Sequence, residues 1–514
     1  MQERSNNKTI AKNTLFLYFR MMFTMLVSLY TSRVILQVLG VDDYGIYQAV
    51  GGIVGFLSFI NGALSTGTSR FLTFELGAGD FEKLKRTFST TLTIHIGLAV
   101  LVVLLAETVG LWFLYNKMVI PMEKMEAAVY VYHISILTAV FTLTQVPYTA
   151  SIIAHERMSV FAYVSIVEVT AKLLVVYLLN IGDFDKLKLY ATLLFIVQIG
   201  LMLFYRVYCT RHFKETKYHF VYDKSILKSI AGFSGWSLFA NASIALNSQG
   251  ILLLLNMFFA PAVVTARAIS IQVNMAATQF VNNFRTAVNP QIVKKYAAGD
   301  VEGSKQLLLS STKYSYYLMF IICFPICLLA EPILKLWLGI VPEYTVIFLQ
   351  LILIQSLFQV FDTSFYTALY AKGQLKENAL ISPTFGLVRF PIIYLLFKMG
   401  CSPVALSWAS LITYAILGLI VKPILIVRIA EYRWCEILQV FKSCLLVTVV
   451  ALPVPCYLAF IWDVSNIGYA ISLLGLTLVL SAISVIVLGI DKVTKRKLQT
   501  FVKKRLLQIV AIFR

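Results

Sequence analysis

The sequence predicts an all-α polytopic membrane protein with about 14 transmembrane helices. Hydrophobic residues make up 59% of the 514-residue chain and charged residues 13%, whereas an average soluble domain is about half apolar and about a quarter charged. The apolar segments are long and continuous, as helical spans of about 20 residues require. This composition excludes an ordinary cytosolic enzyme, a disordered protein and a disulfide scaffold.

Hydrophobic runs predict helices at 13–38, 44–76, 88–114, 126–154, 158–180, 188–212, 227–257, 262–297, 306–330, 345–371, 377–398, 403–428, 438–461 and 467–490. If the N-terminus is cytoplasmic, the inner segments hold 30 of the 44 Lys and Arg residues and the outer segments hold six. The positive-inside rule therefore predicts that both termini are cytoplasmic. This bias explains the formal net charge of +19, so no nucleic-acid partner is expected.

An internal repeat predicts how the helices are grouped. The stretch A-G-D-F-E-K-L-K at 78–85 recurs as A-G-D-V-E-G-S-K at 298–305, 220 residues later. Six predicted helices separate the copies, and an even number of helices per repeat gives parallel halves. The expected divisions are a six-helix lobe at 1–212, a cytoplasmic linker at 213–226, a second six-helix lobe at 227–430, two extra transmembrane helices at 431–490 and a tail at 491–514.

The tail alternates basic and apolar residues at helical spacing. This pattern predicts an amphipathic helix on the anionic lipids of the inner leaflet. A frayed basic tail is the alternative.

Eight basic residues fall outside the predicted loops: Arg20, Arg33, Arg70, Lys172, Arg267, Arg285, Lys313 and Arg389. Arg70 and Lys313 lie near inner helix ends, where they can snorkel. A charge at the bilayer centre costs about 2.5–3.5 kcal/mol on insertion scales, so the others are expected to face the bundle interior or water. Glu168 precedes Lys172 by four residues, the favoured order for a helical pair.

Acidic and amide side chains also fall within the predicted helices, and together with the basic residues they are expected to line a cavity. Asp362 and Glu168 are candidate carboxylates for a coupling Na⁺ or H⁺, and an internal salt bridge is the alternative for each. Helices seven and eight also carry many amides, among them Asn241, Asn247, Gln249, Asn256, Asn274, Gln279, Asn282, Asn283 and Asn289. Arginines suit phosphate oxygens and amides suit sugar hydroxyls. A cavity lined by Arg20, Arg33, Lys172, Arg267, Arg285, Arg389, Asn247 and Asn282 therefore predicts a phosphorylated, hydroxyl-rich ligand.

Common catalytic motifs are missing from the sequence. It contains no G-x-x-x-x-G-K-[ST] phosphate loop, no nucleophile elbow and no H-E-x-x-H motif. A transporter, with neither metal site nor cofactor, is therefore expected rather than an enzyme.

The segment that joins the first two predicted helices resembles a known signature. Arg33, Leu39, Gly40, Tyr44, Gly45 and Tyr47 are similar to the R…LG…YG.Y pattern of bacterial polysaccharide flippases. These belong to the multidrug/oligosaccharidyl-lipid/polysaccharide (MOP) exporter superfamily. The A-G-D turns and the two-lobe plan also resemble that family.

The resemblance implies a flippase in the bacterial inner membrane. Its substrate would be an undecaprenyl-diphosphate-linked oligosaccharide for O-antigen (lipopolysaccharide), capsule or exopolysaccharide assembly, moved by alternating access. It also implies cavity roles for Arg20, Arg33 and Arg267, and glycan assembly proteins as further partners. One alternative is a cation-coupled multidrug exporter, but many of these carry an acid in the first helix and 13–38 has none. Another is a non-transporting scaffold for glycan assembly.

Overall fold

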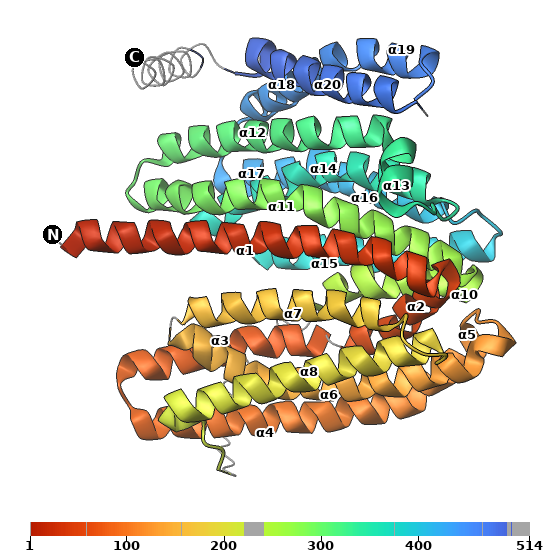
Figure 1. Ribbon diagram of the computed structural model, residues 1–514. Coiled ribbons are helices and arrows are strands. Elements are labelled where there is room, and N and C mark those ends of the chain that lie inside the picture. Colours follow the sequence, from red (N-terminus) through yellow and green to blue (C-terminus); the bar gives the residue numbers. More distant parts are fainter. Residues whose placement is uncertain are drawn as a thin grey trace, which may run out of the picture. The chain divides into compact units, whose positions relative to one another are not determined.

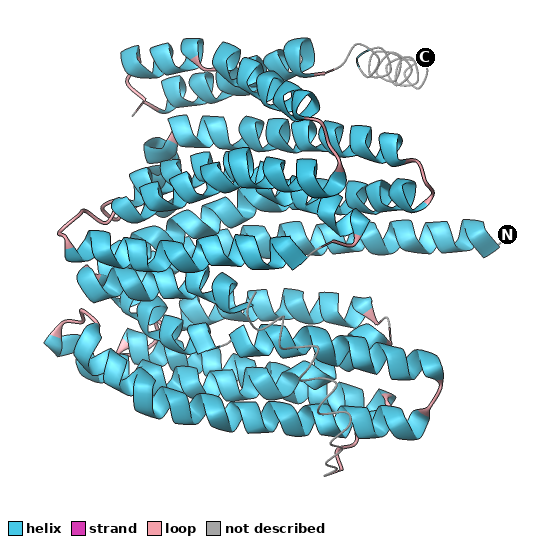
Figure 2. Ribbon diagram, turned by 180° about the vertical axis from the view of Figure 1, so that it is seen from behind, coloured by secondary structure: helices cyan, strands magenta, loops and turns pink. Residues whose placement is uncertain are grey.

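The structure is a computed structural model that describes residues 2–57, 59–155, 157–219, 241–374, 376–464, 466–490 and Lys495 (Figure 1). Over these residues it consists of helices joined by short loops, without a strand (Figure 2). The all-α fold class is therefore confirmed. The predicted tail at 491–514, apart from Lys495, and residues 220–226 of the predicted linker lie outside the described residues.

The α-helices, in chain order, are α1 (Gln2–Leu39), α2 (Val41–Leu57), α3 (Phe59–Ala78), α4 (Phe81–Leu105), α5 (Leu111–Lys117), α6 (Met125–Ala154), α7 (Met158–Leu178), α8 (Lys186–His212), α10 (Ile251–Phe258), α11 (Pro261–Ala297), α12 (Val301–Leu328), α13 (Ala330–Leu338), α14 (Thr345–Lys372), α15 (Lys376–Lys398), α16 (Ala405–Ile416), α17 (Lys422–Ala430), α18 (Trp434–Ala451), α19 (Pro453–Ile461) and α20 (Ile467–Ser484). Short π-helical segments are η1 (Ala106–Gly110), η4 (Leu246–Gly250), η5 (Leu417–Val421) and η6 (Val485–Gly489), and 3₁₀ turns are η2 (Met122–Lys124) and η3 (Lys214–Thr216).

Many of these helices can cross a membrane. By length and composition, the described residues contain 11 such spans, or up to 12 if the bent pair 41–57 and 60–78 forms one. The chain is therefore a multi-pass membrane protein, but the expected count of 14 is not confirmed. Residues 227–240 of the predicted seventh helix lie outside the described residues. The predicted eighth helix is present as α11. It is not one of the 11 spans, because Arg267, Arg285 and its amides lower its mean hydropathy.

Contacts divide the chain into two compact units. Unit 1 comprises 1–269, 337–345 and 383–405, and unit 2 comprises 270–336, 346–382 and 406–514. In unit 1, α6 packs against α2, α3, α4 and α8, and α1 packs against α7. In unit 2, α12, α18 and α20 pack against one another. The predicted lobes at 1–212 and 227–430, and the two extra helices at 431–490, stay a prediction.

The repeated A-G-D stretches form the same kind of turn. Gly79 and Gly299 adopt positive φ angles of 74° and 82°, a conformation that glycine reaches without steric cost. The next residue caps the following helix in each copy. Asp80 accepts a hydrogen bond from the Lys83 amide (3.0 Å), and Asp300 accepts one from the Gly303 amide (2.9 Å). The repeated sequence thus gives a repeated helix–turn–helix structure.

The segment 33–47 joins α1 and α2 and packs on the start of α11. Gly40 makes the turn with a φ of 82°, and Thr265 donates a hydrogen bond to the Val41 carbonyl (2.7 Å). A Cβ atom at Gly45 would overlap the Pro261 carbonyl group and would lie 2.9 Å from the Thr265 Oγ1 atom. Backbone atoms cannot rotate away, so Gly45 allows α2 and α11 to approach closely.

We predict that Gly45→Ala lowers the free energy of unfolding by about 1–3 kcal/mol, the usual cost of overpacking. Gly51→Ala is the matched control in the same helix, because a Cβ atom there meets nothing within 4 Å. Since alanine favours a helix over glycine by roughly 0.5–1 kcal/mol, this control should be neutral or stabilising. Apparent Tm values of the purified variants in detergent measure both effects, and equal values would contradict the packing role.

Candidate functional site

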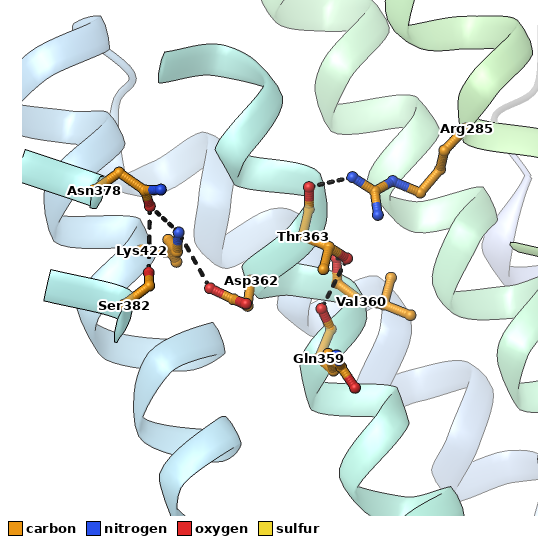
Figure 3. A network of polar contacts seen from close by, with 8 residues as sticks. All are labelled: Arg285, Gln359, Val360, Asp362, Thr363, Asn378, Ser382 and Lys422. Atoms are coloured by element: carbon orange, nitrogen blue, oxygen red, sulfur yellow. Dashed lines mark hydrogen bonds and ion pairs between the residues drawn. The ribbon is translucent and has the colours of Figure 1, made fainter. Parts of the chain in front are cut away.

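A buried lysine joins three helical elements of unit 2. Lys422 is 2% exposed, and its Nζ atom lies 3.2 Å from the Asp362 Oδ1 atom on α14. The same ammonium donates a hydrogen bond to the Asn378 side-chain oxygen on α15 (Figure 3). It also lies 5.7 Å from the centre of the Tyr366 ring. The charge thus has three partners that favour a cation.

A second cation reaches the same network from α11. Arg285 donates a hydrogen bond to the backbone carbonyl of Thr363, the neighbour of Asp362 (Figure 3). Asp362 also attracts Arg285 electrostatically. The carbonyl is neutral, so two positive side chains share one carboxylate in this network. The network, defined by Arg285, Asp362, Asn378 and Lys422, carries one positive charge in excess by formal charge.

The position of Lys422 corrects a sequence-based assignment. Sequence analysis counted Lys422 among the basic residues of the inner segment 422–442, although the predicted helix 403–428 contains it; the residue lies inside the span 405–430. The surrounding sequence L-G-L-I-V-K-P-I-L-I-V is apolar on both sides of the lysine. This is the signal that could have identified a charge within a span. Asp362, a candidate for ion coupling or an internal salt bridge, forms an ion pair with this lysine.

Two predicted site residues meet in unit 1. Arg389 on α15 is 5% exposed and donates a hydrogen bond to the Asn247 side-chain oxygen in η4. Asn247 in turn donates to the Ser243 carbonyl (2.7 Å), and the Ser243 hydroxyl donates to the Pro383 carbonyl (3.1 Å). A Cβ atom at Gly386 would overlap the Asn247 amide nitrogen. A side chain at this position would therefore have to displace the Asn247 amide that binds Arg389.

Three more candidates lie on α1 and α7, which pack against each other. Arg20 donates a hydrogen bond to the Ser165 hydroxyl (3.4 Å) and lies 5.3 Å from the centre of the Phe161 ring. Lys172 and Glu168 form an ion pair of 2.6 Å within α7, at the spacing that the sequence indicates. The Lys172 side chain is 45% exposed. A cavity role for these residues stays a prediction.

The remaining candidates are divided between the two units. Arg33 on α1 is half-buried, and Arg267 on α11 is 4% exposed; both belong to unit 1 and have interaction partners. Asn282 is exposed on the part of α11 in unit 2. The convergence of all the predicted basic residues on one chamber stays a prediction.

A cavity of about 250 Å³ lies within unit 1. It is lined by Tyr47, Gly51, Val54, Gly55, Leu57, Asn61, Val102, Ile134, Ser135, Thr138, Ala139, Thr142, Leu143, Ala191 and Leu194. Every described lining residue is uncharged, and the polar ones carry hydroxyl or amide groups. The buried Asn61 Oδ1 atom has no hydrogen-bond partner among the described residues. Sequence analysis missed this cavity because isolated Ser and Thr residues also occur in ordinary transmembrane helices.

Comparisons with known proteins relate this architecture to transporters. Residues 17–178 match the MatE family model. No curated protein matches the chain. The chain is similar to the lipid II flippase MurJ in an inward closed conformation, with 13% identity, a TM-score of 0.70, and coverage of 91% of this chain and 97% of that one.

Two further structures share the fold. An inward-facing multidrug resistance MATE family transporter of the MOP superfamily gives 14% identity, a TM-score of 0.67, and coverage of 80% of this chain and 98% of that one. A MOP superfamily transporter from Pyrococcus furiosus gives 14% identity, a TM-score of 0.57, and coverage of 82% and 96%. The chain therefore has the fold of MOP superfamily transporters.

We predict that Asn247→Ala lowers the free energy of unfolding by about 1.5–3 kcal/mol, the usual value of a hydrogen bond to a charged group. The variant removes an acceptor from the buried Arg389 guanidinium. Asn282→Ala is the control, because Asn282 is exposed, and it should leave stability nearly unchanged. Apparent Tm values test this, and a larger loss for Asn282→Ala than for Asn247→Ala would contradict it.

Proposed function

We propose that this protein is a flippase of the bacterial inner membrane. Its substrate would be an undecaprenyl-diphosphate-linked oligosaccharide, moved to the outer leaflet by alternating access for O-antigen, capsule or exopolysaccharide assembly. The proposal is supported most directly by the network of Arg285, Asp362, Asn378 and Lys422, in which two basic side chains accompany one carboxylate and Asp362 and Lys422 lie inside membrane spans. Such a charge is costly in hydrocarbon and favours a ligand of opposite sign.

Arg285 is the residue of this network best suited to a diphosphate. Lys422 is 2% exposed and is bound to Asp362 and Asn378, whereas Arg285 is half-buried and donates to a neutral carbonyl. A guanidinium has five N–H donors in a planar fork, which matches the oxygens of a phosphate. We therefore assign the phosphate contact in unit 2 to Arg285.

The cavity of unit 1 supports the sugar part of the proposal. Its hydroxyl and amide groups suit the hydroxyls of a glycan, and its described lining contains no carboxylate to attract a cationic drug. Asn61 offers a buried oxygen that can accept a hydrogen bond from a ligand hydroxyl.

Cation-coupled multidrug export is the competing function. The MatE match and the likeness to a multidrug transporter favour it. It requires an acid that can bind a drug cation or a coupling ion, and the acid of the network in unit 2, Asp362, already pairs with Lys422. Drug exchange driven by Na⁺ or H⁺, without movement of a glycolipid, would favour this alternative.

We predict that Arg285→Gln slows glycolipid flipping by roughly 10- to 100-fold, because a charged hydrogen bond is worth about 1.5–3 kcal/mol. Proteoliposomes that carry a fluorescent undecaprenyl-diphosphate oligosaccharide, digested by an impermeant glycosidase, measure the rate. Lys335→Gln is the control, because Lys335 is 59% exposed and pairs with Glu331; it should flip at the wild-type rate.

Three outcomes would count against the proposal. If the wild-type protein moves no glycolipid, the flippase function is wrong. If Arg285→Gln and wild type flip equally fast, the phosphate contact of Arg285 is wrong. If the wild-type protein instead exchanges drugs, the competing function is correct.

A further inference from the structure

The partners of Lys422 resemble the ligands of a bound monovalent cation. Its ammonium is surrounded by a carboxylate oxygen of Asp362 (3.2 Å), an amide oxygen of Asn378 and the face of the Tyr366 ring (5.7 Å). Carboxylate and amide oxygens are hard ligands that bind hard metal cations, and an aromatic face attracts cations. The site therefore suits a single positive charge, and the Lys422 ammonium supplies this charge.

The two oxygen ligands of the Lys422 ammonium are held in place by their surroundings. The Ser382 hydroxyl donates a hydrogen bond to the same Asn378 oxygen (3.3 Å), one helical turn away on α15 (Figure 3). Asp362 is held on α14, and its side chain is 15% exposed. The two oxygen ligands thus come from different helices, and the cation links them.

Close packing places Lys422 at this site. A Cβ atom at Gly418 would overlap the Phe358 carbonyl oxygen, so η5 lies directly against α14. Lys422 follows Gly418 by four residues, and Asp362 follows Phe358 by four. Because one helical turn is about 3.6 residues, the close contact is repeated one turn later as the ion pair. The relative register of the segment 417–427 and α14 therefore places Lys422 beside Asp362.

We propose that Lys422 is a tethered cation that takes the place of a free Na⁺ or other small cation at Asp362 and Asn378. In consequence the wild-type protein needs no dissolved cation at this position. Removal of the lysine side chain should leave an empty cation site that binds one from solution. This inference is independent of the transported substrate.

The variant Lys422→Ala tests the proposal. The purified full-length protein is heated in detergent with choline chloride, sodium chloride or methylammonium chloride at one ionic strength. We expect the apparent Tm of Lys422→Ala to fall by several degrees in choline, because a buried carboxylate has lost its partner. Sodium or methylammonium should restore the lost Tm with a saturable dose dependence, as linkage requires of a ligand that binds the folded state.

Wild type and the charge-neutral variant Asp362→Asn/Lys422→Gln are the controls, and neither should distinguish the three salts. The proposal is overturned if Lys422→Ala gains no stability from sodium or methylammonium, since Lys422 is then an ordinary salt-bridge partner. It is also overturned if wild type shows a saturable sodium response that the charge-neutral variant lacks. If Lys422→Ala folds in none of the salts while the charge-neutral variant does, solution cations cannot replace the lysine and the proposal fails.

Discussion

The fold of this chain depends on how charges are held inside an apolar environment. A charge at the bilayer centre costs about 2.5–3.5 kcal/mol on insertion scales, so each one needs partners that recover the cost. In unit 2, Asp362, Asn378 and the Tyr366 ring stabilise Lys422, and a backbone carbonyl binds Arg285. Two cations with one carboxylate leave a formally positive site, which favours the anionic substrate that we propose.

In unit 1, neutral polar groups bind two of the candidate arginines. Arg389 binds an amide, and Arg20 binds a hydroxyl and lies beside an aromatic ring. The cavity of unit 1 is also uncharged over its described lining. Glycines make these contacts possible, since Gly386 allows α15 to reach Asn247 and Gly45 allows α2 to reach α11. The two units therefore offer different chemistry, a charged network in unit 2 and a neutral cavity in unit 1.

Sequence analysis was informative where the signal is local. Composition and apolar runs predicted the all-helical membrane fold, and the i, i+4 spacing predicted the Glu168–Lys172 pair. The two A-G-D stretches form equivalent turns, while the two parallel halves that they predict stay a prediction. Sequence analysis failed where the partners are distant in sequence. Lys422 lies 60 residues from Asp362, and Arg389 lies 142 residues from Asn247. The periodicity of a helix relates residues within one helix only. Which charged side chain contacts which distant partner is therefore visible only in the packing of the helices.

Binding of undecaprenyl diphosphate without a glycan tests the central claim most directly. The purified protein is titrated with this lipid and, as a neutral comparison, with undecaprenol at several salt concentrations. We expect that the diphosphate lipid binds more tightly than undecaprenol, that salt weakens this preference, and that Arg285→Gln removes most of it. Equal affinity for the two lipids, or a preference that survives in Arg285→Gln, would contradict the claim that the positive network of unit 2 recognises an anionic head group.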